Sequence, residues 1–475
     1  MFTQGYRLLY VGLLLVWGAL LTGCAPNAAY RTAGIKTDCP AQGCQDAVLE
    51  QHADYDLGFV EFTDRGNVFD RAQMNMLLHH VEQYAHTPDG ATVVVFVHGW
   101  KHNASAADLN VKSFRHLLQQ SAQMGVSGKR RLIGIFVGWR GQSLDMPLGE
   151  HLTYWARKDT AQNVGNGGVT ELLLRLERST AAANTATDPN HTIFLTIGHS
   201  FGGLVLVSAL HDVLLDRALS TTPVGHQFCG SNADTCQTCV QTRPFGHGVI
   251  LLNPAAEANE LLQLKETVAE EQCYAKTQQK LLHVVSSQAD TATNIAFRAG
   301  QYVGVSVTDS ELPLKRIYKG KPVTLDEHEL DTITLGNYLP FRTGVSLKHD
   351  RSNSKLCQTQ GQPRNECYIP CKKDDAKCVS PTHRQQHIPV GSSEPLHFLY
   401  TDANFIRDHN DIFNPRVGGY IAAVAAESSY KRLLAAGMDA HHLVGAACLN
   451  DAQDDFDFPH CFDYFSAAFR TQKLH

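Results

Sequence analysis

The chain has 475 residues, of which 43% are hydrophobic and 19% charged, and its formal net charge is −6. This is an ordinary globular composition, which argues against a disordered chain, a collagen-like fibre and a coiled coil. A slightly acidic chain without a long run of Lys or Arg is also a poor candidate for nucleic-acid binding, and no nucleic-acid partner is expected.

The first 24 residues are organised as an export signal and not as part of the fold. Arg7 supplies a positive charge, and residues 8–21 form an apolar run of 14 residues, whereas a transmembrane helix needs about 20. The run ends in Leu21-Thr22-Gly23-Cys24, which resembles the lipobox of bacterial lipoproteins. An uncleaved anchor or an ordinary secretory signal is the alternative interpretation.

The lipobox resemblance implies a cellular location. It implies a signal peptide over residues 1–23 and a membrane anchor through lipid on Cys24, which would become the first residue of the mature protein. In such lipoproteins the residue after the lipidated cysteine directs sorting, and here it is Ala25 and not Asp. The expected location is therefore the bacterial cell envelope, at the outer membrane.

The cysteines favour the same oxidising environment. The chain has 13, and assigning Cys24 to lipid leaves an even number. They fall into four groups with even counts: Cys39 and Cys44; Cys229, Cys236, Cys239 and Cys273; Cys357, Cys367, Cys371 and Cys378; Cys448 and Cys461. This grouping predicts local disulfides, with zinc binding by Cys236-x-x-Cys239 or Cys367-x3-Cys371 as the alternative.

After a polar stretch at about 25–47, apolar runs alternate with amphipathic segments. The run 91–97 (ATVVVFV) is continuously apolar, as in a buried parallel strand. The segment 108–124 carries its large apolar residues on one helical face. Further strands are predicted at 132–137, 193–197, 249–252, 281–286 and 396–401, and further helices at 171–178, 204–215, about 256–271 and 415–434. This alternation predicts an α/β fold with a doubly wound, mostly parallel sheet.

The predicted organisation has one main domain. Residues 24–90 are expected to be a tether and lead-in, and residues 91–475 the α/β domain. Two cysteine-bearing segments, at about 218–246 and 301–394, lack the alternating pattern and are interpreted as insertions between sheet elements. The second is long enough to form a cap.

The strongest chemical signal is Gly198-His199-Ser200-Phe201-Gly202-Gly203. A Gly-x-Ser-x-Gly pattern alone is weak evidence, but this one directly follows the predicted strand 193–197 and opens the predicted helix 204–215. That strand–turn–helix context is what a nucleophile elbow requires, because the tight turn exposes a strained serine and needs small neighbours. Ser200 is therefore the candidate nucleophile.

At this point the chain resembles the α/β-hydrolase superfamily, over most of residues 91–434. More narrowly, it resembles bacterial esterase- and lipase-like members with a segment such as Phe96-Val97-His98-Gly99-Trp100 before their first helix. In that family the residue after His-Gly and the residue after the nucleophile donate backbone N–H groups to an oxyanion. The resemblance implies that Trp100 and Phe201 form this oxyanion hole.

The acid and the base follow the nucleophile in the order typical of this fold. Asn253 follows the strand 249–252, but an amide cannot replace a carboxylate. Asp290, just past the strand 281–286, is the predicted acid, with Glu257 and Asp402 as alternatives.

The predicted base is His409, on a loop between the last strand and the closing helix. Its surroundings, Asp408-His409-Asn410-Asp411-Ile412, resemble a segment of the same relatives. His397 is the main competitor, but it falls inside the predicted strand 396–401.

These residues imply a lipid-anchored serine hydrolase that cleaves carboxylic esters of small molecules or lipids through an acyl-enzyme, without a cofactor or metal. Two alternatives stay open. One is a disulfide-braced surface lipoprotein that uses the scaffold to bind a partner; the other is an acyltransferase that passes the acyl group to another alcohol.

Overall fold

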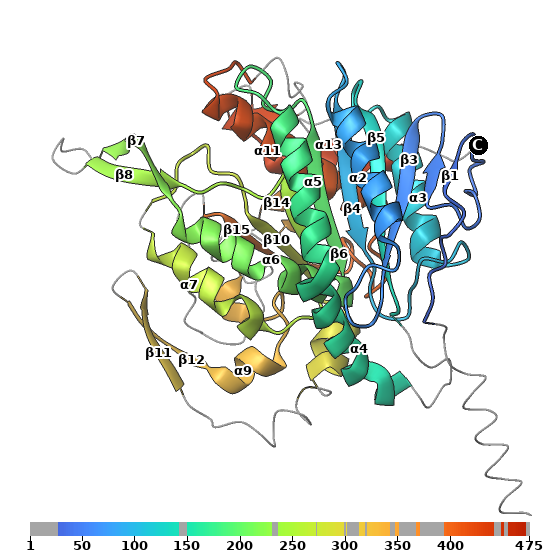
Figure 1. Cartoon of the computed structure of the whole chain (residues 1–475). Coiled ribbons are helices and arrows are strands. Elements are labelled where there is room, and N and C mark those ends of the chain that lie inside the picture. Colours follow the sequence, from blue (N-terminus) through green and yellow to red (C-terminus); the bar gives the residue numbers. More distant parts are fainter. Residues whose placement is uncertain are drawn as a thin grey trace, which may run out of the picture.

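One nine-stranded sheet organises the described residues of the computed structural model (Figure 1). Its order is β1 (Ile35–Lys36), β2 (Leu49–Gln51), β3 (Tyr55–Phe62), β5 (Arg131–Trp139), β4 (Ala91–Val97), β6 (Ile193–His199), β9 (Gly248–Leu252), β10 (Leu282–Ser287), β15 (Leu396–Thr401). Neighbouring strands are parallel except β2 and β3. The structure describes residues 27–141, 150–229, 236–271, 273–298, 301, 313–318, 321–342, 347–350, 367–370, 394–440, 448–450 and 455–471.

Helices cover both faces of the sheet because successive residues of a strand point to opposite sides. In β4, Val93, Val95 and Val97 belong to one core and Val94 and Phe96 to the other. The first core is covered by α2 (Arg71–Ala85), α5 (Thr170–Ala183), α6 (Phe201–Leu219) and α7 (Leu262–Glu270), and the second by α3 (Leu109–Gln123), α11 (Pro415–Ala435) and α13 (Phe458–Thr471). Figure 1 views the first face, with α2 and α5 in front of the strands. The predicted α/β class, with a doubly wound and mostly parallel sheet, is confirmed.

The N-terminal part of the main sheet departs from the expected boundary at residue 91. Residues 35–62 provide β1, β2 and β3, so this part of the expected lead-in belongs to the same sheet. The pattern of β3 is hard to recognise because buried Asp56 and Glu61 interrupt its apolar residues. Asp56 is neutralised by Arg131 at 2.6 Å and bonded to His80 at 2.9 Å.

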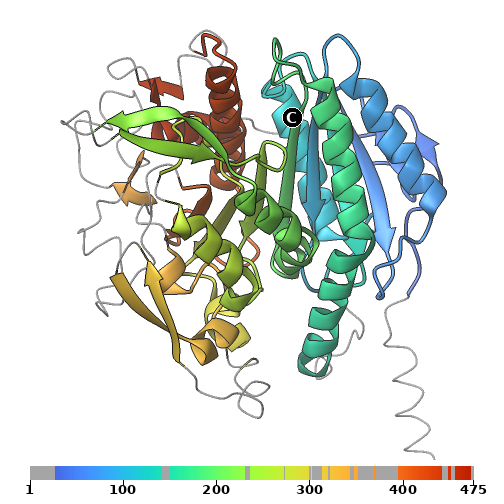
Figure 2. The ribbon, with the colours of Figure 1, turned by 60° about the vertical axis from the view of Figure 1, so that its left-hand side comes forward.

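Two hairpins stand apart from the main sheet within the expected insertions. β7 (Thr222–Cys229) pairs with β8 (Cys236–Gln241), and β11 (Pro313–Tyr318) pairs with β12 (Lys321–Asp326), both antiparallel (Figure 2). The second insertion also contains α9 (Glu327–Thr332) and the antiparallel pair β13 (Leu347–Asp350) and β14 (Cys367–Pro370). The remaining α-helix of the described residues is α4 (Glu150–Val164). The remaining strands are the antiparallel pair β16 (Leu449–Asn450) and β17 (Asp455–Phe456).

Disulfides lie within the predicted cysteine groups. In the described part of the chain, Cys39 is bonded to Cys44, Cys239 to Cys273 and Cys448 to Cys461. The sulfur of Cys239 is therefore not free to act as the zinc ligand considered above. Cys357, Cys371, Cys378, Cys24 and the expected signal peptide lie outside the described residues.

The beginning of the described chain is fixed to the sheet by buried charges. The backbone N–H groups of Tyr30 and Arg31 donate to the Glu61 carboxylate at 2.8–3.0 Å. The Arg31 guanidinium and Arg115 both pair with fully buried Glu50, at 3.1 and 2.8 Å. Because Glu61 lies next to the last residue of β3, Tyr30 is held at the carboxyl edge of the parallel strands.

Over the residues that were described, no helix is both long and apolar enough to cross a membrane.

Candidate active site

Three predicted residues meet at the carboxyl edge of the sheet. Ser200 directly follows β6, Asp290 follows β10, and His409 lies on the loop between β15 and α11. Parallel strands bring their carboxyl ends to one edge, so residues far apart in the chain become neighbours there.

Ser200 occupies a strained turn. Its backbone angles are φ 55° and ψ −122°, a conformation that non-glycine residues rarely adopt. The residue is also the N-cap of α6, but its side chain makes no capping hydrogen bond. Its carbonyl accepts from the N–H groups of Gly203 and Ala255, at 2.9 and 3.0 Å. The turn is therefore fixed by the backbone, which leaves the hydroxyl available for another partner.

That partner is His409. Its Nε2 lies 2.8 Å from the Ser200 hydroxyl, and its Nδ1 lies 2.9 Å from an Asp290 carboxylate oxygen. A carboxylate only accepts, so Nδ1 carries the proton and Nε2 accepts from the serine hydroxyl. Ser200 is 4% exposed, and the His409 side chain 20%, so the imidazole is the more accessible of the two. The arrangement can move a proton from Ser200 toward a base that a buried carboxylate orients.

The Asp290 carboxylate is itself held by the turn that follows it. One oxygen accepts from the N–H groups of Ala292 and Thr293, and the other accepts from the Thr293 hydroxyl at 2.6 Å. Burial raises the pKa of Asp290, but the hydrogen bond and charge of His409 and the bonds from Thr293 outweigh it, so the pKa lies below its usual value. Asp290 is therefore an ionised hydrogen-bond acceptor at neutral pH.

Two further residues position His409 through its backbone. The His199 ring donates from Nε2 to the His409 carbonyl at 2.8 Å, and the Asn253 amide donates to the same carbonyl at 3.2 Å. Burial holds the pKa of His199 well below its usual value, so the ring is neutral. Asn253 also accepts from the Ser287 N–H at 3.1 Å. Asn253, which the sequence excludes as the acid, connects the ends of β9 and β10 to the loop that carries His409.

The loop after β4 lies against the nucleophile. At Gly99, an added Cβ would lie 2.7 Å from Ser200 Cβ, so only glycine fits at this approach. The preceding residue, His98, is fully buried; it donates from Nδ1 to the Gly99 carbonyl and accepts from the Trp139 N–H at 3.1 Å. Beyond it, the rings of Trp100 and Phe201 meet edge to face, with 6.4 Å between their centroids. Trp100 and Phe201, the residues predicted to supply the oxyanion donors, therefore lie close to each other beside Ser200.

The alternative acids and the alternative base have other partners. Glu257 forms an ion pair with Lys158, and Asp402 accepts from the N–H groups of Asn404 and Phe405 at 2.9 and 3.1 Å. His397 lies within β15, as predicted, and its ring contacts buried His283. Among the carboxylates and imidazoles considered above, and within the part of the chain that the structure describes, only His409 bonds to Ser200 and only Asp290 bonds to the His409 ring.

The helix that begins at the elbow packs tightly against the oxyanion loop, which gives a prediction. At Gly202 an added Cβ would lie 2.1 Å from the Val97 carbonyl oxygen and 2.6 Å from that of His98. We expect Gly202→Ala to lower the free energy of unfolding by about 2–3 kcal/mol, because backbone must move to admit the methyl group. Urea unfolding followed by circular dichroism measures this. Ser208→Ala in the same helix adds no atom and is the control; equal stability of the two variants would contradict the packing described.

Comparisons with known proteins identify no family. No protein-family model and no curated protein matches the chain. Among solved structures, the chain is similar to phospholipase PlaB from Legionella pneumophila in complex with thio-NAD, with 15% identity and a TM-score of 0.22. The match covers 50% of this chain and 48% of that one, so this chain spans about half the length of the phospholipase. A likeness this distant says nothing about the activity of this chain.

Proposed function

We propose that the chain is a serine hydrolase that cleaves carboxylic esters, with Ser200 as nucleophile, His409 as general base and acid, and Asp290 as the orienting carboxylate. The observation that carries the proposal is the continuous Ser200–His409–Asp290 connection, at 2.8 and 2.9 Å, at a strained turn between a strand and a helix. A structural serine needs neither the strain nor an imidazole held by a buried acid.

The reaction proceeds in two steps. His409 Nε2 removes the hydroxyl proton as Ser200 Oγ bonds to the ester carbonyl carbon, and the N–H groups of Trp100 and Phe201 stabilise the oxyanion. The protonated imidazole, oriented by Asp290, then gives its proton to the leaving alcohol as the ester bond breaks. Water repeats the sequence on the acyl-enzyme and releases the acid.

We also propose that lipid on Cys24 holds the protein at the outer membrane of a bacterial envelope. Five residues separate Cys24 from Tyr30, so the Cα atoms of the two lie at most about 20 Å apart. Tyr30 is fixed at the carboxyl edge, the edge that bears Ser200. Two exposed apolar side chains lie in segments that follow strands of the same sheet: Leu109 at the beginning of α3, after β4, and Ile295 after β10, at 69% and 66% exposure. This geometry favours an ester presented by the anchoring membrane, such as a lipid.

Labelling with a fluorophosphonate tests the proposed chemistry. We expect one adduct per chain, located on Ser200 by peptide mass spectrometry, because the reagent traps a serine activated by a neighbouring base. Short- and long-chain p-nitrophenyl esters assayed in parallel define the acyl preference, and an added alcohol distinguishes hydrolysis from acyl transfer by its products. If the folded, oxidised protein is not labelled and turns over no ester, the alternative of a partner-binding lipoprotein replaces the proposal.

A further inference from the structure

A cavity of about 790 Å³ lies at the edge of the sheet opposite to Ser200. Its lining includes Thr192 and Phe194 at the beginning of β6, and Gly246 and His247 just before β9. Because a strand rises about 3.3 Å per residue, the length of β6 places the cavity roughly 20 Å from Ser200. The cavity is therefore separate from the candidate active site.

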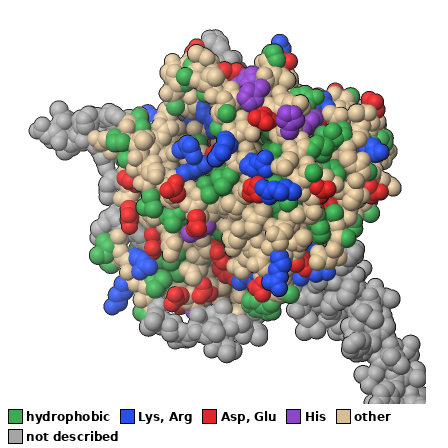
Figure 3. Space-filling model, viewed as in Figure 1, with side chains coloured by type: hydrophobic (Ala, Val, Ile, Leu, Met, Phe, Trp, Pro, Cys, Tyr) green, Lys and Arg blue, Asp and Glu red, His purple; other side chains and the backbone are tan. Residues whose placement is uncertain are grey.

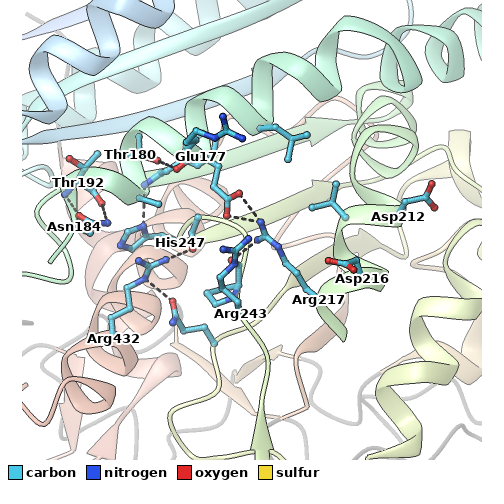
Figure 4. Close-up of a pocket in the computed structure, with 18 residues that line it drawn as sticks. Glu177, Thr180, Asn184, Thr192, Asp212, Asp216, Arg217, Arg243, His247 and Arg432 are labelled. Carbon is cyan, nitrogen blue, oxygen red and sulfur yellow. Dashed lines mark hydrogen bonds and ion pairs between the residues drawn. The ribbon is translucent and has the colours of Figure 1, made fainter. Parts of the chain in front are cut away.

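Guanidinium groups from four parts of the chain line this cavity. Arg178 comes from α5, Arg217 from α6, Arg243 from the segment between β8 and β9, and Arg432 from α11. Figure 4 shows three of them, Arg217, Arg243 and Arg432, around the same space. On the face that carries α2 and α5, basic side chains gather on part of the surface (Figure 3). Such a convergence of positive charge costs free energy unless anions compensate it.

The carboxylates of the lining compensate it only in part. Arg217 Nη2 donates to both carboxylate oxygens of Glu177, at 2.8 and 2.7 Å, so these two charges cancel. Asp212 is bonded to His211, and its side chain is 97% exposed, so its charge is screened by water. Asp216 is also exposed, at the mouth.

Arg432 is the clearest uncompensated cation. Its guanidinium donates to two neutral oxygens, those of the Gln279 amide at 2.9 Å and the Gly246 carbonyl at 2.5 Å. Within the described ranges no carboxylate lies at ion-pair distance from it. Burial lowers the pKa of Arg432 to about 10, and the charge of Glu177 opposes this only in part. A half-buried cation with only neutral partners provides an electrostatic site for an anion.

The neutral polar groups of the lining are already engaged. The Thr180 hydroxyl donates to the Leu176 carbonyl, Asn184 exchanges hydrogen bonds with the Thr192 backbone, and the His247 ring bonds Phe194 N and the Asn190 side chain. In contrast, the exposed guanidinium groups of Arg178 and Arg243 form no ion pair with any residue that the structure describes. We therefore expect the arginines of the lining to recognise the ligand, because one guanidinium group can bind two phosphate oxygens at once.

We propose that this cavity binds a small phosphate monoester, whose phosphate is held by Arg178 and Arg243 at the mouth within the field of Arg432. The doubly charged phosphate compensates the positive charge that the carboxylates of the lining leave unbalanced. Leu174 and Val213 in the lining provide apolar contact for the organic part of the ligand. The phosphate can belong to a free metabolite or to the headgroup of a lipid.

Calorimetric titration of the full mature chain with its disulfides intact tests this. The probes are inorganic phosphate, glycerol 1-phosphate and dihexanoyl phosphatidic acid. We expect saturable binding of one ligand per chain, and a Kd raised about tenfold or more in Arg243→Gln and in Arg178→Gln, because each loses a charge-assisted bidentate contact. Stronger binding of phosphatidic acid than of glycerol 1-phosphate identifies a lipid headgroup, and the reverse identifies a free metabolite.

Two controls separate this site from other effects. Arg175→Gln removes a charge one turn away on α5, outside the cavity lining, and Ser200→Ala alters only the candidate active site. Both are expected to keep the wild-type Kd, so the result is independent of the proposed ester hydrolysis. The absence of saturable binding of all three probes, or an unchanged Kd in both cavity variants, would overturn the proposal. Because Arg178 and Arg243 are exposed, neither substitution threatens folding.

Discussion

Replacing Ser200 with alanine is expected to reduce ester turnover by about 10⁵–10⁶-fold while leaving the fold intact, because the nucleophile is lost and water cannot use the same geometry. The strained backbone of the turn is held by the Ser200 N–H and carbonyl, which bond to Leu252, Gly203 and Ala255 and do not involve the hydroxyl. The free energy of unfolding should therefore change by no more than about 1 kcal/mol.

The measurement combines kcat/KM for a p-nitrophenyl ester with urea unfolding of both proteins. Comparison with Gly202→Ala separates chemistry from stability, because that substitution is expected to destabilise the elbow and keep the hydroxyl. Turnover by Ser200→Ala at more than about one per cent of the wild-type rate, after contaminating esterase is excluded with a fluorophosphonate, would mean that another group is the nucleophile.

A second large effect is expected for Asp290→Asn, about 10⁴-fold in kcat. The asparagine oxygen can still accept from the N–H groups of Ala292 and Thr293, so the turn is retained. Its NH₂ group would then face His409 Nδ1, which has to become the acceptor. The imidazole proton would move to Nε2, and that nitrogen could no longer take the proton of Ser200.

Asp402→Asn is the matched control for the carboxylate. Asp402 also follows a strand, but one of its oxygens accepts from the backbone N–H groups of both Asn404 and Phe405, which an asparagine oxygen can equally do. The other oxygen accepts from the side-chain amide of Asn404 at 3.2 Å, whereas the His409 ring bonds to Asp290. Its kcat should stay within a few-fold of wild type. If Asp402→Asn lost activity and Asp290→Asn kept it, the assignment of the acid would be reversed.

The sequence predicted the elements whose pattern is simple. The continuous run of β4 and the amphipathic pattern of α3 are found at Ala91–Val97 and Leu109–Gln123. The prediction of strands from the sequence failed where ion pairs between distant residues allow polar side chains inside a strand. In β3, the charge of buried Asp56 is balanced by Arg131, which lies far along the chain. A local pattern cannot show such a partner, so the N-terminal strands were missed.

The candidate site could be located because strand ends are recognisable. Ser200, Asp290 and His409 each follow a predicted strand, and topology brings such positions together, while the Gly-x-Ser-x-Gly pattern and the segment around His409 identify the residues themselves. The roles of His199 and Asn253 in holding the His409 carbonyl could not be predicted. Both act through a backbone atom of a distant loop, and no side-chain pattern reports such a contact.

The Ser200–His409 hydrogen bond joins residues 209 positions apart, and the bond from His409 to Asp290 spans 119. Contacts between residues so far apart in the sequence require most of the chain to be ordered first. Closing such a long loop is entropically unfavourable until the strands between the two residues are paired. In refolding, helical signal should therefore recover before ester turnover. The proposed ester turnover would then report the last stage of folding, when β15 has docked beside β10 and the loop before α11 has reached Ser200.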